Sequence, residues 1–510
     1  MSRRPPPERP DPDPTDVPGE VITDAELNPQ TPSAALAAYA ASVAEVAVAR
    51  TGLSGAGEIW RLSWPVMLSQ VLVTMVALVD IAMVGRLGAD AVAAVGYATQ
   101  FFFMTQSALF AVGFACVALM ARSIGAGDRG AARAALVASL MVAVATALIA
   151  AGAILAAPRA VLGLLNADPL VVEMTIPYLR LVLSASVLLA VSLMLESGLR
   201  ADRDTVTPMR IAAAVAGAKI ALNAVLIFGA LGFPRLELVG AGVATVVSQV
   251  LGVVLLVSAV ARRRAGDAVA ITRADLAPSL QLLGKVTRVA APGVAERVIL
   301  NLALLSYFAI LGGYGTAAVA AYTVGVRALS FSWIPGTGFA AAVATLVGQS
   351  LGANDEEEAV RIGRRAAVMA VVVAVVLGVV GGGAREPIAR VFSDDPAIIG
   401  ALMPFMLCLA IAQPMLQLHF TLAGVHRGAG DTWTPLFAAT MGNWAFRVPL
   451  ALLFARVLEA DLVWLWIVLI FDHTARAAWL VASFRRGAWR TRMAGPGLPD
   501  RALTKVGSSP

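Results

Sequence analysis

Charged and aromatic residues are both scarce in this sequence. Of its 510 residues, only 14% are charged and 6% are aromatic, whereas 59% are hydrophobic. A soluble domain carries roughly 25% charged residues and about 45–50% apolar ones. The shortage of charge therefore excludes an ordinary soluble domain. The composition, with a mean hydropathy of +0.79, indicates an integral membrane protein.

Cysteine and histidine are nearly missing as well, with two and three copies. Cys116 and Cys408 lie far apart inside apolar runs, which argues against a disulfide framework or a metal site. Each is predicted to pack as a small hydrophobic side chain. We therefore expect no metal and no cofactor. The formal net charge of +6 is interpreted as loop arginines, so no nucleic-acid partner is expected.

Recognisable catalytic motifs do not occur either. The H-E-x-x-H and Walker A patterns are absent. The segment GQSLG (348–352) matches the G-x-S-x-G nucleophile pattern, but no strand precedes it, and a related segment reads ARSIG (121–125). We interpret it as a loop turn, and the sequence predicts no enzyme.

Long apolar segments fill most of the chain beyond its N-terminal region. A helix of about 20 apolar residues crosses a bilayer, and these segments are too long and too uniform for barrel strands. The predicted fold class is all-α integral membrane with twelve transmembrane helices. The expected spans are residues 59–84, 91–120, 131–157, 171–198, 208–230, 238–261, 288–312, 317–347, 363–384, 397–424, 434–456 and 462–484.

Arginine is distributed unevenly between the loops. The loops after even-numbered spans and the C-terminal tail are rich in it, whereas the loops after odd-numbered spans hold few. The positive-inside rule then predicts a multi-pass protein of the cell membrane with both termini in the cytoplasm. Residues 1–57 are rich in proline and aspartate at their start, which predicts a disordered tail, with a surface helix near Ser33–Arg50.

The sequence contains an internal duplication. SIGAGD (123–128) returns as SLGAND (350–355), an offset of 350 − 123 = 227 residues. RADRDTVTP (200–208) returns as RGAGDTWTP (427–435) at the same offset. One register held over so long a stretch indicates a gapless duplication.

Each copy holds six spans, an even number that returns the chain to its starting side. The copies are therefore parallel repeats about an axis along the membrane normal. Pro65 and Pro292 hold equivalent places in the first helix of each copy. The predicted organisation is a tail (1–57), an N-lobe (58–261), a cytoplasmic linker (262–285), a C-lobe (286–484) and a C-terminal tail (485–510).

These features resemble the multidrug and toxic compound extrusion (MATE) family from Glu58 to about Arg486. The resemblance rests on SWPVMLSQVLVTMVALVDIAMVGRLGADAVAAVG in the first helix and its loop, on SIGAGD, on RADRDTVTP with its echo, and on GAGVAT at Gly240. It implies two six-helix bundles forming a V, alternating access, and export of drugs or metabolites in exchange for protons or sodium ions.

Asp80 is a lone acid inside the first span. An acid in lipid must face protein or water, where it can take up a proton or pair with a cation. The resemblance implies that Asp80 is the coupling carboxylate in the N-terminal cavity and that Pro65 is the hinge of its helix. The alternative is a structural ion pair.

The fifth span supplies a partner for this acid. Lys219 and Asn223 lie one turn apart on one helix face. The resemblance to DinF-type members implies an Asn and an Asp at these two positions. Compared with them, this chain has lost a carboxylate and gained an ammonium. We predict an Asp80–Lys219 switch in which a proton or a cationic substrate competes with Lys219, which favours H⁺ over Na⁺ as the coupling ion. In the alternative, Lys219 snorkels or lies on another face.

The second copy departs from the family as well. The resemblance to NorM-type members implies a cation site with a Glu on helix 7 and an Asp on helix 10. In this chain the register places Leu300 and Leu416 at those positions. Such a sodium site is therefore not expected. Glu296 is interpreted as paired locally with Arg297, and His426 is expected to be solvated at the cytoplasmic end.

Polar residues gather on the last two spans. Asp472 and Arg476 are four residues apart and can pair along a helix. Arg447, in the middle of its span, needs a partner, for which Asp472 is the candidate. We favour a structural network that includes Asn443 over a second coupling site.

The leading hypothesis is a secondary active exporter, expected to be a monomer in the lipid bilayer, for a small-molecule substrate. An aromatic face beside a carboxylate suits an organic cation, although each aromatic residue can also serve packing alone. The alternative is a flippase or ion-independent facilitator of the same superfamily, for a metabolite or a lipid-linked substrate, in which Lys219 replaces the coupling ion. The candidate substrate-cavity residues are Gln70, Tyr97, Phe101, Tyr307, Gln413 and Gln417.

Overall fold

The computed structural model describes residues 55–163, 168–264, 266–392 and 394–491. The surface helix expected at residues 33–50 lies outside the described residues. The described residues are helical and contain no strand.

The predicted fold class is confirmed, because twelve helices in the described residues are long and apolar enough to cross a membrane. The first copy contributes α2 (Ala56–Gly85), α3 (Ala89–Gly125), α4 (Arg129–Ala156), α6 (Pro169–Ala201), α7 (Val206–Phe228) and α8 (Glu237–Ala261). The second contributes α9 (Leu280–Leu311), α10 (Thr316–Ser332) with α11 (Ile334–Gly352), α12 (Glu356–Gly383), α14 (Pro396–Gly428), the segment from α15 (Trp433–Thr440) to η5 (Leu453–Val457), and α17 (Leu462–Arg486).

Two spans of the second copy are irregular, which the hydrophobic pattern did not predict. The eighth breaks after α10, and Pro335 opens α11, a position where its missing N–H costs nothing. The eleventh contains two π-helices, η4 (Met441–Arg447) and η5, on either side of α16 (Val448–Leu452). Segments of π-helix are rare and occur frequently at functional sites.

Further helical segments lie between the spans. The short helices α5 (Pro158–Gly163) and α13 (Arg385–Phe392) begin 227 residues apart, at equivalent places in the two copies. Helix α9 begins at Leu280, so the last residues of the expected linker, 262–285, are already helical. Cys116 and Cys408 are both buried and free, as predicted.

The duplication is repeated in the helix caps. Asp128 and its equivalent Asp355 each accept a bond of 2.8 Å from a backbone N–H in the first turn of the following helix. Asp168 and its equivalent Asp395 do the same for α6 and α14, at 2.9 and 2.8 Å. Such caps satisfy N–H groups that have no partner inside the helix, so equivalent aspartates start equivalent helices in the two copies.

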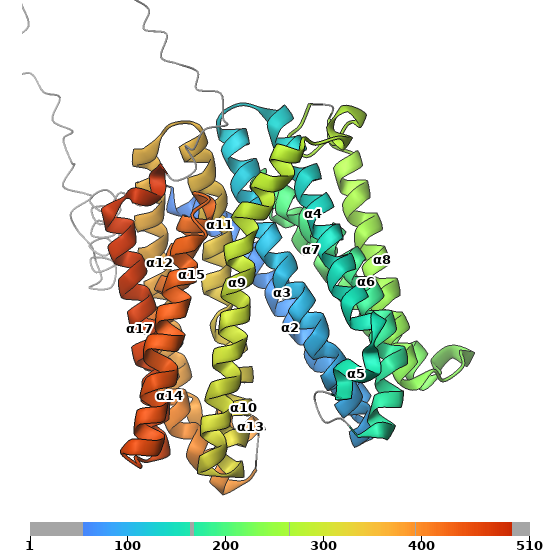
Figure 1. Cartoon of the computed structure of the whole chain (residues 1–510), viewed down its shortest axis with the longest axis vertical. Coiled ribbons are helices and arrows are strands. Elements are labelled where there is room, and N and C mark those ends of the chain that lie inside the picture. Colours follow the sequence, from blue (N-terminus) through green and yellow to red (C-terminus); the bar gives the residue numbers. More distant parts are fainter. Residues whose placement is uncertain (1–54, 164–167, 265, 393, 492–510) are drawn as a thin grey trace, which may run out of the picture. The chain divides into compact units, whose positions relative to one another are not determined.

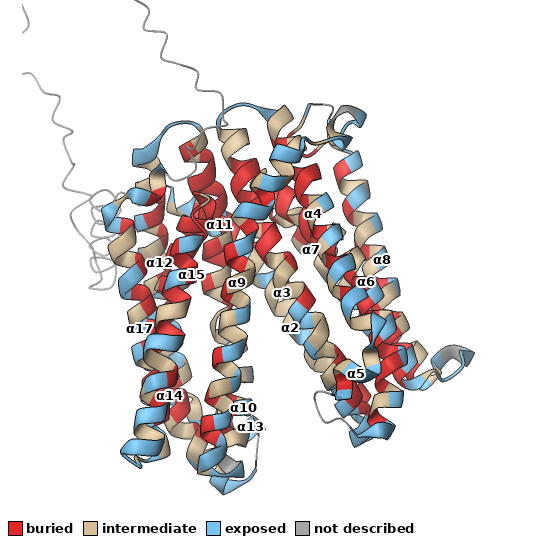
Figure 2. Cartoon of the chain, viewed as in Figure 1, coloured by how far each residue is buried: buried red, intermediate tan, exposed pale blue. Residues whose placement is uncertain are grey.

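The two lobes contact each other along α2 with α11, α3 with α11, and α3 with α9 (Figure 1). Buried residues are dense along α11 where it adjoins the other lobe (Figure 2). Arg203 donates to Gln349 Oε1 at 2.6 Å, and Gln349 donates to the carbonyl of Ala201 at 2.7 Å. These contacts lie at the end that carries the loops 126–128, 202–205, 353–355 and 429–432, which we call the arginine-rich end.

Glycines allow this close contact and correct one prediction. The segment GQSLG was predicted to be a loop turn, but it forms the last turn of α11, and its Gly352 packs against α3. A Cβ on Gly352 would lie 2.1 Å from the carbonyl oxygen of Arg122. One on the equivalent Gly125 would lie 1.9 Å from that of Gln349. Only glycine permits such an approach, so the two helices cross backbone to backbone.

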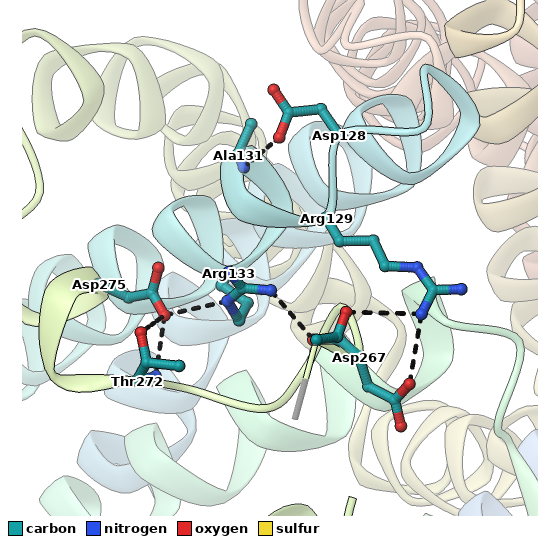
Figure 3. Close-up of polar contacts among 8 residues, drawn as sticks. Asp128, Arg129, Ala131, Arg133, Asp267, Thr272 and Asp275 are labelled. Carbon is teal, nitrogen blue, oxygen red and sulfur yellow. Dashed lines mark hydrogen bonds and ion pairs between the residues drawn. The ribbon is translucent and has the colours of Figure 1, made fainter. Parts of the chain in front are cut away.

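The segment between the lobes is held on α4 of the N-lobe (Figure 3). Arg129 donates to Asp267 at 3.3 Å, and Arg133 donates to Asp275 at 3.0 Å. Thr272 also donates to Asp275 through its N–H and its hydroxyl. Burial would raise the pKa of Asp275, but the bonds from Thr272 and Arg133 outweigh it and hold that pKa below its ordinary value.

Candidate functional site

Asp80 lies on α2, which packs against α7. Lys219 of α7 donates to Asp80 Oδ2 at 2.5 Å, and Asn223 donates to Oδ1 at 2.5 Å. The predicted contact is therefore present, and Lys219 does not lie on another face of its helix. The coupling role of these three residues stays a prediction.

The site is electrically neutral and partly open. The side chains of Asp80 and Lys219 are 24% and 18% exposed, whereas Asn223 is buried. The Oδ1 atom of Asn223 has no hydrogen-bond partner among the described residues. A proton placed on Asp80 would remove one charge of the pair and release the ammonium of Lys219. The arrangement can therefore exchange a proton for an internal ion pair.

The other predicted N-lobe residues lie on α2 and α3. Pro65 is buried within α2, and Gln70 is half-buried on the same helix. Tyr97 and Phe101 pack against a core cluster that contains Val84 and Ile227. Val84 and Ile227 follow Asp80 and Asn223 by one turn on α2 and α7, so this core cluster adjoins the ion pair.

The three cavity candidates in the C-lobe are buried in this structure, and their role in a substrate cavity stays a prediction. Tyr307 is fully buried and donates to the carbonyl of Leu465 at 2.6 Å. Gln413 is bonded to the hydroxyl of Ser332, and Gln417 donates to the carbonyl of Ser332 at 2.5 Å. The two glutamines satisfy backbone and side-chain groups where the eighth span is broken.

A buried ion cluster joins α17 to the π-helix η4. Asp472 is bonded by Arg447 at 2.5 Å and by Arg476 at 2.6 and 2.9 Å, so the predicted pairing is present. Asn443 is buried on η4 and donates to the carbonyl of Ala439. A Cβ on Gly442 would lie 2.3 Å from Asp472 Oδ1. The backbone of η4 therefore packs directly on the ion cluster.

Two predictions are wrong, one for the partner of Glu296 and one for the exposure of His426. Glu296 is bonded by Arg427 of α14 at 2.8 and 2.9 Å, not paired with its neighbour Arg297 alone. His426 is fully buried rather than solvated, and its Nδ1 lies 3.1 Å from Asp431. Both errors arise from tertiary contacts, because α14 enters the interior of the protein at its last turns.

A small cavity of about 50 Å³ lies between the lobes and is lined by Arg200 and Arg427. These arginines are equivalent in the two copies. Arg200 is paired with Glu196 at 2.7 Å, and Arg427 with Glu296, while the Arg427 guanidinium lies 4.5 Å from the Phe114 ring of the N-lobe. Sequence reasoning missed this pair, although both residues begin the repeated RADRDTVTP-type segment.

Among the described residues, no group of three His, Cys, Asp or Glu side chains could hold a metal ion. Leu416 takes the place of the acid that the resemblance to NorM-type members implies on helix 10, and it is buried in the C-lobe core.

The fold and the site define a twelve-span membrane protein built from two parallel repeats, with a titratable carboxylate inside the first lobe. The MatE family model matches residues 65–225 and 292–453, two segments that begin 227 residues apart. The chain belongs to the MatE family of membrane transporters, as the resemblance implied.

Related proteins cover most of the chain. It is 27% identical over 440 residues to the "Probable multidrug resistance protein NorM" of Thermotoga maritima, covering 85% of this chain and 93% of the relative. It is 29% identical over 448 residues to the protein of the same name from Bradyrhizobium diazoefficiens, covering 85% and 94%.

Solved structures share the fold. The MATE transporter VcmN of Vibrio cholerae in the bent form has a TM-score of 0.80 at 20% identity, covering 87% of this chain and 98% of that one. A MOP superfamily transporter from Pyrococcus furiosus has a TM-score of 0.79 at 22% identity, covering 85% and 96%.

Proposed function

We propose that this chain exports drugs or other small organic compounds by alternating access, in exchange for protons taken up at Asp80. The observation that carries the proposal is the triad of Asp80, Lys219 and Asn223 inside the first lobe. Relatives named as multidrug resistance proteins support the drug class of substrate.

The ammonium of Lys219 favours a proton over a sodium ion. It already occupies the position beside Asp80 Oδ2 that a bound sodium ion would take. A sodium ion would have to displace it and then lie close to a like charge, which is costly inside a membrane. A proton needs no such space, because it binds the carboxylate itself. No cofactor is required for this cycle.

Orientation follows from the charge of the loops. We place the arginine-rich end and both termini in the cytoplasm, by the positive-inside rule. The contacts of Gly125, Gly352 and Gln349 would then close the cytoplasmic side of a monomeric transporter. Proton entry from the opposite side would break the Asp80–Lys219 pair and favour the other state.

A second candidate function is supported by the same ion pair. If Lys219 replaces the coupling ion permanently, the chain is an ion-independent facilitator or a flippase. In that case the substrate itself separates the pair, and no ion gradient drives transport.

Proteoliposomes holding the purified protein separate the two candidates. Ethidium, a fluorescent organic cation, serves as the transported probe, and an imposed pH gradient should accelerate its movement. Asp80→Asn should abolish this acceleration, whereas Asp90→Asn, at the exposed start of α3, should leave it intact. Transport that ignores the pH gradient would favour the facilitator, and transport driven by a sodium gradient would overturn the choice of ion.

A further inference from the structure

The ion cluster of the C-lobe carries more positive than negative charge. Asp472 is its acid, and both Arg447 and Arg476 are bonded to it. Glu296 also acts electrostatically on Arg476, but both of its oxygens accept bonds from Arg427. Among the described side chains, one positive charge of the cluster therefore has no counterion.

The cluster lies deep in the lobe. Arg447 is near the middle of the span Trp433–Val457, and its side chain is only 12% exposed. Asp472 is fully buried, and His473 beside it is 6% exposed. An unbalanced charge at such depth is costly, and intramembrane ionisable groups usually mark a ligand or an ion path.

Two polar atoms of the cluster are left without partners. The Nε–H of Arg447 and the Nδ1 of His473 are buried and make no hydrogen bond with any described residue. A guanidinium N–H can only donate, and an imidazole nitrogen can donate when it carries its proton. Leaving such groups unsatisfied in a buried site costs about 1–3 kcal/mol each.

From the excess positive charge and these unpartnered groups, we propose that the C-lobe holds an anion-binding site at Arg447, Arg476 and His473. The ligand is a monovalent anion, either an inorganic halide or the carboxylate of an organic substrate. The π-helix η4 supports this site, because it brings Arg447 to Asp472 while the backbone at Gly442 packs on Arg476. The site is separate from the Asp80 triad and goes beyond proton-coupled export.

Equilibrium binding to the purified full-length protein tests the site without any transport. Choline chloride is titrated against choline methanesulfonate, whose anion is neither a halide nor a carboxylate, at constant ionic strength, and thermal unfolding and tryptophan fluorescence are followed. Chloride should raise the Tm in a saturable way. Sodium benzoate, compared with choline benzoate, should do the same through its carboxylate and independently of its cation.

Two variants change the charge of the cluster in opposite directions. Arg447→Met leaves the neutral Asp472–Arg476 pair and should weaken chloride binding by roughly tenfold or more, because a charge-assisted bond is lost. Asp472→Asn removes the competing carboxylate and should tighten chloride binding. Arg235→Met, which removes an exposed cation from the N-lobe, is the control and should bind chloride as the parent does.

The outcomes are distinct. No saturable chloride effect, or an effect that persists in Arg447→Met, would overturn the site. If Asp472→Asn fails to fold, the Arg447→Met comparison still decides. Benzoate that competes with chloride and is itself transported would identify a substrate carboxylate as the ligand. Transport whose rate depends on chloride without such competition would identify the inorganic anion.

Discussion

Ile59 and Val286 hold equivalent positions in the two repeats, and each is buried in the core of the opposite lobe. Ile59, in the first turn of α2, belongs to the same hydrophobic cluster as Phe339 of α11. Val286, in the second turn of α9, belongs to the same cluster as Leu136 of α4. The lobes therefore exchange the starts of their first helices, and each such helix has one part in each lobe.

Pro292 lies six residues beyond Val286, inside α9 and next to Gly293, which still packs against Ala111 of the N-lobe. A proline inside a helix removes one hydrogen bond and costs up to about 3 kcal/mol, which makes this position easier to bend. We expect Pro292→Ala to raise the Tm and to slow transport in proteoliposomes. Pro169→Ala, at the start of α6 where proline is tolerated, should change neither by as much. Unchanged transport in Pro292→Ala would rule out the hinge.

The glycines at the crossing of α3 and α11 should tolerate no side chain. Gly352→Ala would place a methyl group 2.1 Å from a backbone carbonyl, so the lobes would have to separate at the arginine-rich end. We expect a loss of about 1–3 kcal/mol of stability, the range for overpacking. A cysteine in place of Thr345 should be labelled faster by a thiol reagent. Gly152→Ala, inside α4 and with no atom within 4 Å of the added methyl group, is the control and should leave labelling unchanged without lowering the Tm.

The Glu296–Arg427 pair should behave as a buried ion pair. Glu296→Gln leaves the guanidinium uncompensated and should destabilise the protein by about 3–5 kcal/mol. The double variant Glu296→Met with Arg427→Met should recover most of that loss, because both charges are removed. The coupling energy is obtained from unfolding in detergent of Glu296→Met, Arg427→Met and the double variant. A double variant as unstable as the sum of the singles would contradict a direct pair.

Asp204 at the end of the loop before α7 should make stability depend on pH. Burial would raise its pKa, but bonds from Thr207 and Arg263 outweigh it and hold the pKa below the ordinary 3.8. Its contribution is therefore present above pH 3.8 and is lost as pH falls through the lower folded value. We expect Asp204→Asn to lower the Tm at pH 6, because the ion pair with Arg263 is lost, which removes about 0.5–1 kcal/mol of stability. It should flatten the fall in Tm between pH 5 and 3.

The neighbouring Asp202 gives the opposite sign and serves as a matched comparison. Burial raises its pKa above the ordinary 3.8, despite Arg263, so folding favours its protonated form. Asp202 therefore weakens the folded state above that raised value, and Asp202→Asn should raise the Tm at pH 7. If both variants shift the Tm in the same direction at neutral pH, the opposed pKa shifts are wrong.

Much of the fold could be predicted because membrane insertion leaves clear marks in a sequence. Apolar length gave the twelve spans, and a constant offset gave the two copies, down to caps such as Asp128 and Asp355. The breaks in the eighth and eleventh spans could not be predicted. At these irregular segments Gln417 bonds Ser332 and Asp472 bonds Arg447, and hydropathy records neither contact between helices.

The candidate site could be predicted because an unpaired carboxylate inside a membrane span is energetically unfavourable. Asp80 needs a partner in a low-dielectric interior, and Lys219 with Asn223 on one helix face offered it. Glu296 was misplaced because its sequence neighbour Arg297 could have paired with it, and His426 because its position beside Arg427 indicated a solvated end of a span. Local pairing and tertiary pairing are equally compatible with such a pattern.

The sequence by itself determined the membrane class, the two six-span repeats and the lone acid of the first span, because apolar length and repetition are one-dimensional properties. Tertiary structure decided the pairings that the sequence left open. It exchanged the starts of α2 and α9 between the lobes, drew Arg427 to Glu296 and left the Asp472 cluster with an excess positive charge. The reason is that an ion pair depends on helix rotation and crossing, which the packing of small residues such as Gly125 and Gly352 fixes.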